Sequence, residues 1–334
     1  MDHKEQSSEN NYLEGRKVGI IGVSLKEGQD LEGPEKAPEF LREAGLHEII
    51  NSLDWEYQDY NDIKEENISV ENLNLNDYKY SNLKNSLQLG AACKSLNMYV
   101  KKIAEAKQFS LILGGDHGLA SGSISALKTV YPDLKVIWID AHADCNIPEE
   151  SSSGNYHGMP VAHLLGWIPE KTVPGFDWFK PCLTKDDIVY IGLRDVDPWE
   201  KMNLKKNEIK CFTMHDVSKY GIGVVVEKAL QYLSKDGKNH PLHLSFDIDG
   251  IDPYVAYGTG TKSRGGLIYR EAQYIVREIA ATGRLIGLDL VEINPLLDKP
   301  RESFHGDNKL IHNATETIAL GLELIACALG DTQI

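Results

Sequence analysis

The chain has 334 residues, of which 42% are hydrophobic, and a formal net charge of −15. This length can bury a substantial core, in one large α/β domain or in two smaller ones. So acidic a chain is a poor general partner for nucleic acid or an anionic membrane, and no run approaches the roughly 18 apolar residues that span a bilayer.

In chain order, residues 1–15 are predicted to form a disordered arm, and the rest alternates short apolar strands with amphipathic helices. Strands are expected at 16–23, 109–115, 134–140, 187–193, 209–214, 242–249 and 284–293. The longer helices are expected at 37–53, 86–107, 119–130, 223–233, 269–281 and 314–329, with a short one near 161–167. Residues 56–84, rich in Asn, Asp and Tyr, are interpreted as a weakly ordered loop.

Such alternation predicts an α/β fold with a parallel sheet covered by helices on both faces. No break in composition divides the chain, so we expect residues 16–334 to form a single domain. Five dispersed cysteines without CxxC spacing indicate reduced thiols. The polar start shows neither a secretory nor a transit peptide, and we therefore expect a cytoplasmic protein.

Acidic and imidazole side chains gather where four of the predicted strands end. In open α/β sheets this carboxyl edge is where ligands bind. The motifs are GGDHG at 114–118, DAHAD at 140–144, SFDIDG at 245–250 and LVEINP at 290–295. Asp116 and Asp252, beside these ligand candidates, are interpreted as turn or capping residues.

Alternate residues of an extended segment point the same way, so side chains from three of these strand ends can converge on one point. The converging set is His117, Asp140, His142, Asp144, Asp247 and Asp249. Four gathered carboxylates repel one another unless cations compensate them. Oxygen and imidazole ligands without thiolate suit Mn²⁺, and six ligands suit two ions about 3.5–4 Å apart with a bridging hydroxide. We therefore predict a dimanganese hydrolytic centre.

The motifs GGDHG, DAHAD and SFDIDG, in this order and spacing, resemble the ureohydrolase family from about residue 16 to residue 329. SSSGNYHG at 151–158 and IGLRDVDP at 191–198 resemble its arginase branch. The resemblance implies an arginase-like fold and hydrolysis of the L-arginine guanidinium to L-ornithine and urea. It also implies a homotrimer with two Mn²⁺ per subunit.

The resemblance assigns the metal ligands in two overlapping sets. The first manganese would be bound by His117, Asp140, Asp144 and Asp247. The second would be bound by Asp140, His142, Asp247 and Asp249. Asp140 and Asp247 would then bridge the ions.

The same resemblance assigns catalytic and substrate-binding residues. Asp144 would relay a proton, His157 would exchange protons with solvent, and Glu292 would pair with the guanidinium. The substrate-binding residues would be Asn146, Ser151, Ser153 and Asn155 at the α-carboxylate, Asp197 at the α-amino group and Thr261 at the guanidinium end.

Three other functions are weighed against this one. The first is an agmatinase or a hydrolase of another guanidino acid, and SSSGN and Asp197 argue against it because agmatine has no carboxylate to bind. A binding or regulatory protein without catalysis would not need the intact ligand set together with His157 and Glu292. A deacetylase on a related sheet has different motifs.

Several features depart from the arginase pattern or are interpreted without a functional role. Lys262 and Arg264 stand where arginases have small or apolar residues, and segment 296–313 is longer than in many of them. Cys145 is interpreted as a small packing residue, His163 as an ordinary helix residue and Trp138 as part of the core.

Overall fold

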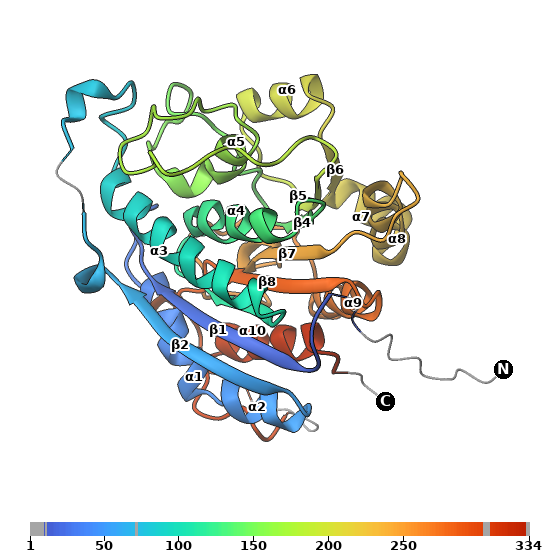
Figure 1. Ribbon diagram of the computed structural model, residues 1–334. Helices are drawn as coiled ribbons and strands as arrows, with labels where there is room; N and C mark the ends of the chain where they lie inside the picture. The colour runs from blue at the N-terminus through green and yellow to red at the C-terminus, as the bar shows by residue number, and fades with distance from the viewer. Residues whose placement is uncertain (1–9, 11, 71–72, 303–307, 332–334) are drawn as a thin grey trace.

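The computed structural model describes residues 10, 12–70, 73–302 and 308–331 (Figure 1). Its strands are Lys17–Ser24 (β1), Glu56–Lys64 (β2), Phe109–Leu113 (β3), Lys135–Ile139 (β4), Ile188–Leu193 (β5), Lys210–Thr213 (β6), Leu242–Asp247 (β7) and Leu285–Val291 (β8). They form one eight-stranded sheet in the order β2-β1-β3-β8-β7-β4-β5-β6. Every neighbouring pair is parallel, as the sequence predicts.

Helices cover both faces of this sheet (Figure 1). Within the described ranges they are Ala37–Glu43 (α1), Leu46–Ser52 (α2), Ser86–Glu105 (α3), Ala120–Val130 (α4), Pro160–Leu164 (α5), Pro198–Lys206 (α6), Met214–Tyr220 (α7), Ile222–Leu233 (α8), Tyr269–Ala281 (α9) and Glu316–Ala328 (α10). Ile112 of β3 packs in one apolar cluster with α3 and α4, and its neighbours Leu111 and Leu113 pack in another with α8, α9 and α10. Successive strand residues point to opposite faces, so one buried strand supplies both layers.

The prediction of a weakly ordered loop over residues 56–84 is wrong for residues 56–64, because these residues form the edge strand β2. Its side chains are mostly polar, so the apolar signal of a buried strand is missing. Backbone pairing with β1 holds it, and Arg42 of α1 binds Asp59 at 2.7 Å and Asp62 at 2.6 Å. The strand is thus specified by long-range partners rather than by its own pattern.

The single helix predicted over 37–53 is divided into α1 and α2 at Gly45. Gly45 has φ of 112°, and a Cβ there would lie 2.2 Å from the carbonyl oxygen of Leu310. Only glycine fits this conformation and this close approach. Leu310 belongs to segment 296–313, of which residues 303–307 lie outside the described part, and Ile311 of that segment packs into the core.

Of the predicted N-terminal arm, residues 1–9 and 11 lie outside the described part of the chain. Where the arm is described, Asn10 Nδ2 donates to the Leu285 carbonyl at 2.7 Å and Glu14 N donates to that of Lys107 at 2.9 Å. None of the helices in the described ranges has the length and apolar character needed to cross a membrane.

Candidate metal centre and substrate site

The predicted ligands lie at the carboxyl edge of the sheet, as their positions after the strands require. His117 follows β3, Asp140 follows β4, and Asp247 ends β7. These strands are close in the sheet order, with β8 between β3 and β7 and with β7 beside β4. Segments far apart in sequence therefore deliver their side chains to one place.

The first ligand group surrounds the imidazole of His117. Its Nδ1 atom lies 3.2 Å from Asp140 Oδ2, 3.1 Å from Asp144 Oδ2 and 3.4 Å from Asp247 Oδ2. All four side chains are buried. One potential ligand atom from each residue lies within 4.8 Å of the others.

The second ligand group surrounds His142 and shares Asp140 with the first. His142 Nδ1 lies 3.4 Å from Asp140 Oδ1 and 3.1 Å from Asp249 Oδ2. This group comprises Asp140, His142 and Asp249, so Asp247 falls only in the first group. Asp140 is the residue common to both groups, and the bridging roles of Asp140 and Asp247 stay predictions.

The chemistry of this cluster fits divalent cations. Burial and the charge of Asp140 raise the pKa of Asp144 to about 7, and burial with the charges of Asp249 and Asp140 raises the pKa of Asp247 well above its usual value. Nδ1 of His117 is buried, faces three carboxylates and has no hydrogen-bond partner in the described structure. Such a set of mutually repelling oxygens and one open imidazole nitrogen is what a bound cation would satisfy.

Residues around the ligands hold them in position. His117 Nε2 is 2.8 Å from Ser245 Oγ, which leaves Nδ1 to face the carboxylates. Trp138 is buried, as predicted for a core residue, but it also belongs to the site. Its ring stacks on His117 at 4.0 Å and its Nε1 donates to Asp140 Oδ2 at 3.0 Å.

Glu292 is enclosed by three donors beside the first ligand group. Its Oε1 accepts from the His117 backbone N at 2.9 Å and lies 3.0 Å from His157 Nδ1, while Oε2 accepts from Gln29 Nε2 at 2.5 Å. Burial lowers the pKa of His157, but the hydrogen bond and charge of Glu292 outweigh it and raise that pKa to about 9. His157 and Glu292 therefore form an ion pair at neutral pH.

Gln29 was missed by the sequence analysis. It lies in the Gly- and charge-rich loop that follows β1, and its side chain is buried. The available signal was its place after the carboxyl end of a strand, where site residues gather. Asp195, also not predicted, has an Oδ2 atom 3.8 Å from His142 Nε2.

Two of the residues at the ligand cluster have left-handed backbones. Asp144 has φ of 48° and Glu292 has φ of 62°. This region is unfavourable for residues with a side chain and is retained where the surrounding structure enforces it. In Glu292 the backbone N donates to Gly115 O at 2.9 Å, which ties the turn after β8 to the GGDHG segment.

The predicted substrate-binding residues fall into three places. Asn146 Nδ2 donates to Asp197 Oδ2 at 3.0 Å, so these two are adjacent. Ser151 and Ser153 have hydroxyls 3.4 Å apart and turn the loop by accepting from the backbone N of Gly154 and Asn155.

Thr261 lies apart from that loop, with its Oγ1 donating to Asp249 Oδ2 at 2.7 Å. It thus contacts a member of the second ligand group. The next residue, Lys262, places its ammonium 3.9 Å from the ring centre of Tyr257.

The residues interpreted as structural behave accordingly. Asp116 accepts from Gly28 N and Gly118 N, both at 2.9 Å. Asp252 accepts from the backbone amide of Tyr254 in its own turn and from the amides of Gly265 and Gly266 further along the chain. Cys145 is buried, and burial raises the pKa of its thiol well above the usual value, which suits a packing residue. His163 of α5 is also buried, with Nδ1 2.6 Å from the Tyr156 hydroxyl.

The parallel sheet and the two overlapping ligand groups at its carboxyl edge place the chain among α/β proteins built for a binuclear metal centre. The sequence profile of the arginase family matches residues 16–329. The chain therefore belongs to the arginase family.

Individual relatives agree with this placement. An arginase from Plasmodium berghei is 42% identical over 346 aligned positions, covering 99% of this chain and 96% of the relative. Human arginase-1 is 47% identical, with 86% of this chain and 88% of that protein covered. The solved structure of Bacillus caldovelox arginase superposes with a TM-score of 0.82 at 32% identity, covering 96% of this chain and all of that one.

Proposed function

We propose that the chain hydrolyses the guanidinium group of L-arginine to L-ornithine and urea, with two manganese ions per subunit. The observation that carries the proposal is the pair of ligand groups sharing Asp140, with the Glu292–His157 ion pair beside them. Membership of the arginase family and the relatives named arginase support the same reaction. When bound, the two cations would activate water as a nucleophile near neutral pH and offset the charge of the clustered carboxylates.

The residues around the cluster would bind and orient the substrate. Glu292 is ionised, because His157 holds its pKa below the usual value despite the opposing effect of burial. A buried carboxylate can hold a guanidinium by charge-assisted hydrogen bonds. Its present donors, Gln29 and the His117 amide, fix the carboxylate so that its orientation is set before the substrate arrives.

Two residues are placed to move protons. Asp144 reaches the first ligand group with its carboxylate, so we assign it the transfer of a proton to the departing amine. The His157 side chain is 19% exposed and contacts Glu292, so it can exchange protons between the site and solvent. These roles rest on position and on the family resemblance together.

We assign the substrate's amino-acid end to the loop after Asp144. Asn146 and the hydroxyls of Ser151 and Ser153 would donate to the α-carboxylate, with Asn155 beside them. Asp197, held by Asn146, would accept from the α-amino group. Thr261, fixed on Asp249, would shape the guanidinium end. Agmatine lacks the carboxylate, so this loop would give it no partner.

The test is urea release after manganese loading, with L-arginine and agmatine assayed side by side. Urea from arginine alone is the expected result. Urea from agmatine alone would keep the metal centre but contradict the role of the loop. No urea from either substrate, with two metals bound, would favour the binding or regulatory alternative. Magnesium loading serves as the control for the identity of the metal.

We further propose that the protein is a cytoplasmic homotrimer. Five free cysteines, three of them buried, are compatible with a reducing compartment. The mass of the manganese-loaded protein in solution tests the trimer, and a monomer would contradict it.

A further inference from the structure

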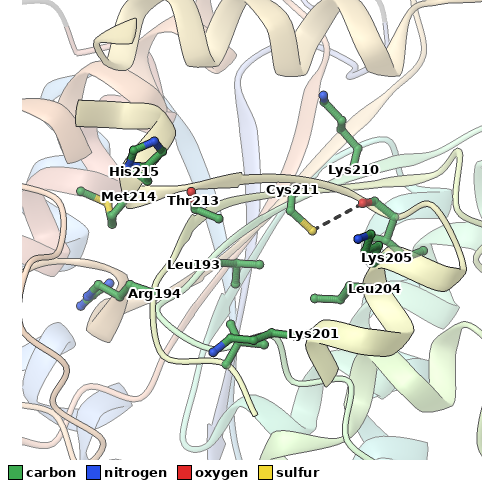
Figure 2. A pocket seen from close by; sticks show the side chains of 12 residues that line it. Leu193, Arg194, Lys201, Leu204, Lys205, Lys210, Cys211, Thr213, Met214 and His215 are labelled. Carbon is green, nitrogen blue, oxygen red and sulfur yellow. Dashed lines mark hydrogen bonds between the residues drawn. The ribbon is translucent and has the colours of Figure 1, made fainter. Parts of the chain in front are cut away.

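A cavity lies at the β6 edge of the sheet, and its lining includes none of the residues of the two ligand groups. Its volume is about 610 Å³, and it is bounded by the end of β5, by α6, by β6 and by the start of α7 (Figure 2). This volume lies within the range of about 300–1,000 Å³ that is usual for small-molecule sites. No role proposed above uses this cavity.

The inner side of the cavity is apolar. Leu193, Leu204 and Ile209 line it and are largely buried. Cys211 also lines it, and its Sγ is directed to the Ile209 carbonyl at 3.5 Å (Figure 2). At Gly192, with φ of 108°, the pairing of β5 with β6 shifts by one residue. The cavity therefore offers apolar surface that a hydrocarbon or aromatic group can cover.

The charged residues of the cavity are all basic. Lys201 and Lys205 lie one turn apart on α6, and Lys210 lies on β6. No aspartate or glutamate lines the cavity. The charge of the cavity lining is therefore positive, whereas the chain as a whole, with 50 acidic and 35 basic residues, is negative. Within the described structure none of the three lysines forms an ion pair with a carboxylate.

Arg194 also lines the cavity but is already engaged. Its guanidinium donates to the carbonyl oxygens of Asp249 at 2.6 Å and Ser263 at 2.7 Å. Lys210 places its ammonium 4.6 Å from the ring centre of Phe212, so the lysines left to meet a ligand are Lys201 and Lys205. Lys201 and Lys205 are four residues apart on α6, so they are neighbours on the helix surface, where one anionic group could contact both.

We propose that this cavity binds an amphipathic organic anion, with an apolar body against Leu193 and Leu204 and a carboxylate or sulfonate at Lys201 and Lys205. The apolar lining selects for the body, and the lysines select for the charge. A simple inorganic anion would contact the lysines but not the apolar lining, so it should compete poorly with an amphipathic anion for the cavity.

The test is fluorescence titration with 1-anilinonaphthalene-8-sulfonate, an aromatic sulfonate of this class, on the manganese-loaded protein. We expect saturable binding to one site per subunit, unaffected by L-ornithine, which would occupy the catalytic site. K201E/K205E should weaken it about tenfold or more, because charge-assisted contacts are lost and like charge replaces them. K206E/K238E changes the net charge equally at exposed positions outside the cavity and should leave the affinity within twofold.

Circular dichroism and the thermal midpoint establish that both double variants are folded. Equal weakening in the two variants would overturn the proposal, as would displacement by L-ornithine or the absence of saturable binding to the unsubstituted protein. Sodium sulfate matched to sodium chloride in ionic strength should displace the probe no better than the chloride does. Stronger displacement by sulfate would show that the site recognises charge alone and would also overturn the amphipathic assignment.

Discussion

The metal-ligand cluster and the substrate loop at 146–155 are neighbours in sequence but are built differently. The side chains of the cluster lie at the ends of several strands, and all except His142 are buried, so the sheet fixes their positions. In the loop, Ser153 is exposed and Ser151 and Asn155 are half-buried. Hydrogen bonds between residues of the loop itself shape it. The difference teaches that the fold preorganises the metal-ligand residues, whereas the proposed recognition of the substrate's far end would rest on local turns that tolerate change.

The largest effect is expected from D144A, which removes a carboxylate from the centre of the cluster. We expect kcat to fall by about a hundredfold or more, because a proton relay and a ligand are lost together. Metal analysis should show weaker binding of one manganese. D252N is the control, because within the described structure the hydrogen-bond donors to this carboxylate are backbone amides. Full activity of D144A in a metal-replete assay would contradict the whole assignment.

His157 joins the two regions, because it follows the loop and contacts Glu292. H157A is expected to lower kcat by about ten- to a hundredfold, less than D144A, since solvent or buffer can replace a proton shuttle. Added imidazole should restore part of the rate. An unchanged rate at every pH would remove His157 from the mechanism.

The loop is tested by S151A/S153A. We expect KM for arginine to rise by roughly tenfold with little change in kcat, because lost hydrogen bonds to a carboxylate weaken binding in the ground and transition states alike. S152A changes the exposed serine between them and is the matched control. A fall in kcat with unchanged KM would show that the loop serves the chemistry rather than recognition.

The last prediction concerns stability rather than activity, at the anchor after the loop where Tyr156 contacts His163. Burial lowers the pKa of His163 to about 3 from 6.5, so the folded state keeps it neutral. Well above pH 6.5 His163 is neutral in both the folded and the unfolded state, so it does not change the free energy of unfolding. As pH falls below 6.5, the unfolded state gains a proton that the folded state does not, and stability drops by about 1.4 kcal/mol per pH unit.

Between pH 6.5 and pH 5 this histidine should therefore cost about 2 kcal/mol of the free energy of unfolding. H163N keeps an acceptor for Tyr156 but does not titrate, so its loss over the same interval should be smaller by that amount. Urea denaturation at both pH values measures the difference. If the free energy of unfolding falls equally in the two proteins, another titrating group causes the acid sensitivity.

Predictability from sequence follows the same division between regions. The buried strands and the ligands that end them were predictable, because Asp and His alternating directly after an apolar run indicate a metal site at a strand end. β2 was not, since its polar residues are held by β1 and Arg42 rather than by a pattern of their own. Gln29 was missed for a similar reason, because the contact that marks it as a site residue is with Glu292, 263 residues away in the chain.

The order of the strands also has a consequence for how the chain is made. β7 and β8 lie in the middle of the sheet, between β3 and β4, yet they come after both in the sequence. In this order β1–β3 and β4–β6 have native pairing partners only within two separate groups until β7 and β8 have been synthesised. The same strands bring Asp247, Asp249 and Glu292. We therefore expect a chain truncated before residue 242 to self-associate through its unpaired strand edges and to bind manganese weakly, because Asp247 and Asp249 are missing.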